Sequence, residues 1–320
     1  MDNTRNKLFG DIYNYYQSHF DELSFGKKLH FATRLGHWDE DPFCVKKLTY
    51  LQSEFAGGMD ARENMHRLYN KFLNQDQAGS KNANDLRLPI FQKYPHLRTM
   101  NIILFRSLVY MQTYGIDCRE IVAELYPHDE IGTYLDKLFQ DKESVAILST
   151  HAINTQYLYR RLIQQTEERE LFDPQTIYEL GKTWYDFSDK AHLKLYIYLY
   201  THCIIGESIF YTRQVPDTYL LIYIKMLQDL ESVITAHYND INLDNKCEYL
   251  ACCQIMGVSS SLRSRIDDEC QNSVSNTGTF IVDTLNSNPQ SESVDLDKSE
   301  HRNVLYIMSN RPYRPQDQPR

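Results

Sequence analysis

Three histidines stand at intervals that could bring them together in the folded chain. His151 and His202 each follow a threonine and lie 51 residues apart, and His301 comes 99 residues later. Imidazole titrates nearest to neutral pH and is the commonest metal ligand among side chains. The three histidines could therefore transfer protons, bind a substrate or hold a metal ion. The alternative is that they are buried or cavity-lining residues without metal.

Tyrosines accompany these histidines. The chain contains 24 of them, and Tyr196, Tyr198 and Tyr200 alternate directly before His202. A buried tyrosine offers a large apolar face and a hydroxyl that needs a hydrogen-bond partner. A cavity lined by Tyr and His would suit an apolar ligand with a few polar groups. If chemistry occurs there, we expect His202 to act as general acid-base, His151 and His301 to assist, and Tyr200 to donate a hydrogen bond; the simpler interpretation is that the tyrosines are core.

Two acidic segments are interpreted mainly as helix starts. Asp41 directly precedes Pro42, and Asp244 lies at the end of an Asn/Asp-rich stretch before an apolar segment. A carboxylate at a helix N-terminus accepts hydrogen bonds from free backbone N–H groups. The chain has no phosphate-binding glycine loop, Cys-x-x-Cys, His-Glu-x-x-His or Gly-x-Ser-x-Gly motif. Nucleotide hydrolysis and serine hydrolysis are therefore disfavoured.

The elements that must position these residues are predicted to be helices. Only 12 glycines and 10 prolines occur in 320 residues, too few for the turns of a many-stranded sandwich or barrel. Apolar residues recur at helical spacing, and the clearest stripe lies between Pro216 and His237. The net charge of −9 argues against a nucleic-acid binder, which needs an electropositive face. The sequence predicts an all-α protein.

Strongly apolar helices recur about every 50 residues and alternate with amphipathic ones. The predicted apolar helices span residues 44–55, 99–114, 147–163, 195–211, 248–256 and 301–308. The predicted amphipathic helices span residues 60–73, 116–139, 173–191, 216–237 and 261–271. A helix that is apolar all round needs neighbours on several sides, whereas an amphipathic helix can face water. Five or six helical hairpins are expected, closed as an α/α toroid or open as an α-solenoid.

The segment from Cys270 to Ser309 resembles one repeat of the α/α-toroid proteins, such as prenyltransferase β subunits and triterpene cyclases. Gln271, Gly278 and Phe280 would form the turn after an outer helix, and His301 would open the next inner helix. The resemblance implies a closed ring of hairpins. In prenyltransferase β subunits an Asp, a Cys and a His hold zinc, with the His at the head of a late inner helix. No Asp-x-Cys precedes His301, so no metal ligand is assigned here.

Zinc would accept a mixed set of imidazole and thiolate ligands, to which Cys203 and Cys270 could contribute. The seven cysteines are odd in number and scattered, which indicates a reducing cytoplasm. The N-terminus does not read as a secretory signal, and the apolar run 195–206 is too short for a membrane span. We expect a soluble cytoplasmic protein.

Residues 1–308 are predicted to form one helical repeat domain, and the proline-rich residues 309–320 a disordered tail. Two functions stay open. The first is binding of a small molecule or modified peptide in a central Tyr/His-lined cavity, with or without catalysis. The second is a scaffold for a protein partner, as α-solenoids provide.

Overall fold

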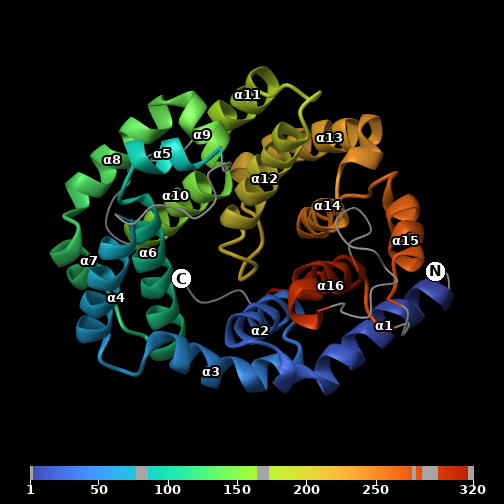
Figure 1. Cartoon of the computed structure of the whole chain (residues 1–320), viewed down its shortest axis with the longest axis horizontal. Coiled ribbons are helices and arrows are strands. Elements are labelled where there is room, and N and C mark those ends of the chain that lie inside the picture. Colours follow the sequence, from blue (N-terminus) through green and yellow to red (C-terminus); the bar gives the residue numbers. More distant parts are fainter. Residues whose placement is uncertain (1–2, 77–85, 164–172, 276–278, 283–294, 316–320) are drawn as a thin grey trace. The chain divides into compact units, whose positions relative to one another are not determined.

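The computed structural model describes residues 3–76, 86–163, 173–275, 279–282 and 295–315 (Figure 1). Within these residues 78% of positions are helical, in sixteen α-helices and three short 3-10 helices. No strand occurs in this part of the chain, where Val274 and Ile281 form an isolated antiparallel bridge. The predicted all-α class is confirmed.

The packing of the helices divides the chain into two compact units. Unit 1 contains residues 1–51 and 210–320, and unit 2 contains residues 52–209. The helices of unit 1 are α1 (Asn3–Ser18), α2 (Phe25–Asp39), the first part of α3 (Pro42–Ala56), α13 (Leu220–Ala236), α14 (Leu243–Ile255), α15 (Arg263–Asn272) and α16 (Leu296–Asn310). Those of unit 2 are the end of α3, α4 (Ala61–Asp76), α5 (Leu88–Lys93), α6 (Leu97–Tyr114), α7 (Arg119–Leu125), α8 (His128–Gln140), α9 (Lys142–Leu148), α10 (Thr150–Ile163), α11 (Pro174–Trp184) and α12 (Lys190–Glu207).

Unit 2 is built of two layers of helices. The predicted apolar helices correspond to α6, α10 and α12, and each packs against the next in this order. In Figure 1, helices α4, α7, α8, α9 and α11 lie along one side of this row. Helix α12 is buried around most of its circumference, as its apolar sequence predicts.

Unit 1 also has a row of packed helices, in which α16 lies between α14 and α2. Helices α1, α13 and α15 lie beside this row (Figure 1). Helices α1 and α2 precede the first helix of the predicted repeat. Their buried side chains include Tyr16, Phe31 and Trp38, which supply much of the aromatic core of this unit.

Two predicted helices are each divided in two. The chain between residues 116 and 139 breaks at Pro127, which has no N–H group for a helical hydrogen bond, so α7 and α8 are separate. The chain between residues 147 and 163 breaks at Ser149, whose φ of +47° ends α9 before α10 begins. In both places a single residue decides the boundary within a continuous apolar pattern.

The helix starts follow side-chain caps. Asp41 accepts a hydrogen bond from the backbone N–H of Cys44 at 3.0 Å at the start of α3, which confirms the predicted cap. The predicted cap at Asp244 is wrong. Asn242 caps α14 by accepting from the N–H of Asn245, and Asp244 lies inside the helix, where it pairs with Arg302 at 3.1 Å.

The C-terminal segment packs onto α2. Helix α16 continues to Asn310, the indole of Trp38 donates to the carbonyl of Arg311, and the Tyr313 ring lies 4.7 Å from the Trp38 ring. The rest of the predicted tail, residues 316–320, lies outside the described residues. The closed toroid and the open solenoid stay predictions. Among the described helices none is long and apolar enough to cross a bilayer.

Candidate functional site

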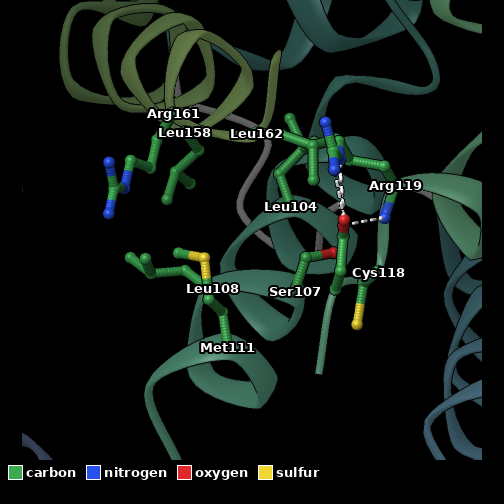
Figure 2. Close-up of a pocket in the computed structure, with 10 residues that line it drawn as sticks. Leu104, Ser107, Leu108, Met111, Cys118, Arg119, Leu158, Arg161 and Leu162 are labelled. Carbon is green, nitrogen blue, oxygen red and sulfur yellow. Dashed lines mark hydrogen bonds and ion pairs between the residues drawn. The ribbon is translucent and has the colours of Figure 1, made fainter. Parts of the chain in front are cut away.

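A cleft in unit 2 lies between α6 and α10. Helix α6 contributes Leu104, Ser107, Leu108 and Met111, and α10 contributes Leu158, Arg161 and Leu162. Both sets follow helical spacing of three and four residues, so each forms one stripe on its helix. Figure 2 shows Leu158 and Arg161 on one side of the cleft and Leu108 and Met111 on the other. The facing walls are therefore mainly aliphatic.

The segment after α6 closes one end of the cleft. Gly115, with a φ of +64°, ends α6 and turns the chain so that Asp117, Cys118 and Arg119 line the cleft. The guanidinium of Arg119 donates from Nε to Asp117 Oδ2 at 2.8 Å, and this contact holds the pKa of Asp117 below its usual value. Burial raises the pKa of the Cys118 thiol to about 12, so it is not a nucleophile at neutral pH.

Arg161 is the exceptional side chain of the cleft. Its Nε is buried, and among the described residues it has no hydrogen-bond or ion-pair partner. Burial lowers the pKa of Arg161, and no carboxylate of the described residues offsets this shift. Arg119 lies across the cleft from Arg161 (Figure 2) and pairs with Asp117, so Arg161 supplies the remaining positive charge among the described residues that line the cleft.

The cleft is narrow. Its volume is about 370 Å³, which includes space open to solvent, and only a small part of this volume is enclosed. The enclosed part accepts a single side chain or the end of an aliphatic chain, and the rest of a longer chain has to lie along the solvent-open part of the cleft. A bulky ring system does not fit inside it.

The predicted histidines of unit 2 lie elsewhere in its helices. The His151 ring meets the ring of Phe91 edge-on at 5.1 Å. The Nδ1 of His202 lies 2.9 Å from Asn154 Oδ1, three residues after His151 on α10. His202 is half-buried, although the residues on either side of it, Thr201 and Cys203, are buried.

Tyr200 is fully buried, and its hydroxyl donates to the backbone carbonyl of Tyr178 at 2.7 Å. A hydrogen bond of this kind satisfies the hydroxyl inside the core. None of the four predicted catalytic residues lines the α6–α10 cleft, and their catalytic roles stay a prediction.

His301 belongs to a polar cluster in unit 1, which we call the Glu300 cluster: Lys27, His30, Arg34, Glu300 and His301. The His301 ring lies 5.3 Å from the His30 ring. Glu300, one residue before His301 on α16, is completely buried and lies 2.8 Å from His30 Nδ1 and 3.3 Å from Lys27 Nζ. Arg34 Nε donates to His30 Nε2 at 3.0 Å.

The hydrogen bonds of the Glu300 cluster fix the state of His30. Because Arg34 can only donate, His30 Nε2 accepts, and the ring proton is on Nδ1, which donates to Glu300. Burial lowers the pKa of His30 well below its usual value, and the charges of Arg34 and Lys27 lower it further. Burial raises the pKa of Glu300 to about 7 against the opposing effect of Lys27. Arg34 occupies the nitrogen with which His30 would accept a substrate proton, so the cluster is not arranged for base catalysis.

Metal ligation has no support in the described part of the chain, where no group of three or more His, Cys, Asp or Glu side chains could hold an ion. Cys203 and Cys270 are both fully buried, and burial raises the pKa of each thiol well above its usual value.

Comparisons of the chain with protein-family models, with curated proteins and with solved structures give no match. The function is therefore argued from the sites themselves. Sequence reasoning missed Arg161, although one signal was available: Arg160 and Arg161 interrupt an apolar helix. Arg160 pairs with the buried Glu207 at 3.1 Å, which leaves Arg161 as the cation of the cleft.

Proposed function

We propose that the protein binds an amphipathic small molecule, an aliphatic chain with a carboxylate end, in the cleft between α6 and α10. The observation that carries this proposal is Arg161, a partly buried cation without an acidic partner in the described residues, beside an aliphatic cleft. This proposal keeps the apolar ligand expected from the sequence and replaces its Tyr/His-lined cavity with a leucine-lined one.

The leucine side chains of the cleft favour the aliphatic chain of such a ligand, and the positive charge of Arg161 favours its carboxylate. Leu104, Leu108, Leu158 and Leu162 would remove an aliphatic chain from water, at about 25 cal/mol for each Å² buried. A carboxylate would give the Arg161 guanidinium an acceptor that the described residues do not supply. A charge-assisted hydrogen bond contributes about 1.5 to 3 kcal/mol, so the carboxylate should bind at least about tenfold more tightly than the matching alcohol.

The test is a calorimetric titration with decanoate, decanol and decylamine as probes. We expect decanoate to bind more tightly than decanol, and decylamine to bind weakest because Arg161 repels it. Arg161→Gln should abolish the preference for decanoate over decanol. Arg62→Gln, which removes the same charge from a surface pair with Glu124 in the same unit, should leave it unchanged.

Leu162→Glu provides the complementary variant, because it places a negative charge on the half-exposed aliphatic wall. It should weaken decanoate binding and spare decylamine. Equal binding of decanoate and decanol to the wild type, or a preference that survives in Arg161→Gln, would contradict the proposal.

A further inference from the structure

Helices α14 and α15 of unit 1 meet through two adjacent pairs of residues. Cys247 of α14 and Cys270 of α15 are completely buried, with their Sγ atoms 3.8 Å apart. One position earlier on each helix, Lys246 Nζ lies 2.7 Å from a carboxylate oxygen of Glu269. The two helices are therefore matched residue by residue at this point.

We propose that Cys247 and Cys270 form a modification site that a hydroperoxide converts to a disulfide, fastening α15 to α14. The two sulfur atoms are already in van der Waals contact, whereas a disulfide joins them at about 2.0 Å. The remaining approach is roughly 2 Å, which side-chain rotation together with a small shift of α15 can supply. The ion pair beside them holds the register in which the sulfurs face each other.

The surroundings of the two thiols determine how fast they react. Lys246 is almost completely buried, at 1% side-chain exposure, and its ammonium pairs with Glu269 beside the two sulfur atoms. The thiolate is the reactive form of a cysteine. Burial raises the pKa of the Cys270 thiol, and Cys247, Asp267 and Glu269 raise it further. The site should therefore react slowly, in step with local opening of the ten-residue helix α15.

The reaction is a two-electron oxidation of the two thiols. One thiolate attacks a peroxide oxygen, the O–O bond breaks, and a sulfenic acid forms as hydroxide leaves and takes up a proton. The second thiol then attacks the sulfenic sulfur, forms the S–S bond and releases water. With hydrogen peroxide, the sum is two thiols and one peroxide giving one disulfide and two waters.

The structural consequence is a covalent clamp on α15. A cross-link between residues 247 and 270 prevents the two helices from separating, so the opening that exposes α15 to solvent is restricted. Reduction by a dithiol would restore the free thiols, and the modification is reversible on this scheme.

The decisive experiment treats the folded full-length protein with hydrogen peroxide, alkylates the remaining thiols and maps the peptides without reduction. We expect a cross-linked peptide pair containing Cys247 and Cys270, a mass loss of two hydrogens, and at least tenfold slower amide exchange in α15. Reduction should reverse all three changes. Cys247→Ser and Cys270→Ser should each abolish the cross-link, whereas Cys203→Ser, at another fully buried cysteine, should retain it.

The wild-type peptide map decides the matter even if a serine variant fails to fold. Full alkylation of both cysteines after peroxide treatment would overturn the proposal. So would their conversion to sulfinic acid, or a disulfide that joins either of them to a different cysteine.

Discussion

The partly buried arginines of this protein differ in whether a carboxylate lies close enough to neutralise their charge. Arg160 and Arg302 lie beside Glu207 and Asp244, at 3.1 Å in each case. Arg161 is partly buried without such a partner in the described residues. An unpaired buried cation costs free energy that a bound anion can recover. This contrast, rather than the presence of arginine, marks the cleft.

The Glu300 cluster makes stability depend on pH. Burial raises the pKa of Glu300 to about 7, above the value of about 4.5 expected in the unfolded chain. The folded state therefore holds a proton that the unfolded state releases, and this contribution to stability is lost as the pH rises through 7. Glu300→Gln mimics the protonated form. Relative to the wild type, the variant should gain about 1 kcal/mol in free energy of unfolding between pH 6 and pH 8.

His30 acts in the opposite direction, because its lowered pKa removes stability as the pH falls below 6.5. Because His30 contacts Glu300 directly at 2.8 Å, the comparison reports the titration of the pair, to which His30 contributes mainly below pH 6.5. Urea titrations across this pH range supply the measurement. Glu231→Gln is the matched control: although burial raises the pKa of Glu231, hydrogen bonds from Ser261 and Tyr249 bring it below its usual value. Parallel curves for Glu300→Gln and the wild type would contradict the assignment.

At this scale the sequence located the region of the cluster but not its central residue. The sequence predicts a functional role for His301, because imidazole titrates near neutral pH, and it predicts that the helix begins at this residue. Helix α16 begins five residues earlier, which turns Glu300 inward on the same face as Val304. Which of two adjacent polar residues faces the core depends on the helix start and on partners such as His30, some 270 residues away in sequence.

At the scale of helices, close approach to α12 depends on glycine. A Cβ atom on Gly206 would lie 2.2 Å from the ring of Tyr157 on α10. We expect Gly206→Ala to lower the free energy of unfolding by about 1 to 3 kcal/mol, because the buried ring has to shift. Gly10→Ala in α1 is the matched control, since nothing lies within 4 Å of its added methyl group. Alanine there should raise stability by up to about 1 kcal/mol through helix propensity.

Thermal and urea denaturation of the two variants measure this difference. Equal changes in the free energy of unfolding for the two variants would show that α10 and α12 tolerate a wider separation than their packing indicates.

The helices themselves were predictable because alternating apolar and amphipathic stripes extend over many residues. The close contact between α10 and α12 was not predictable, because a glycine in an apolar run does not indicate which aromatic ring packs against it.

At the scale of the whole molecule, the regular 50-residue rhythm predicts one continuous domain, while the packing groups the helices into two units. The rhythm holds inside unit 2, where α6, α10 and α12 succeed one another. It gives no sign that the N-terminal helices α1 and α2 pack against α16 at the other end of the chain. Such a long-range contact depends on complementary side chains, which periodicity does not reveal.

The two units should open separately in hydrogen exchange, because each contains its own buried row of helices. Gly206→Ala should speed amide exchange in α6, α10 and α12 and leave α14 and α16 near their wild-type rates. Leu305→Ala removes a completely buried side chain from α16, at a cost of about 2 to 5 kcal/mol, and should produce the reverse pattern. Mass spectrometry of exchanged peptides distinguishes the two patterns. If either variant speeds exchange uniformly across both units, the chain opens as one cooperative body, and the separation into units describes packing without describing stability.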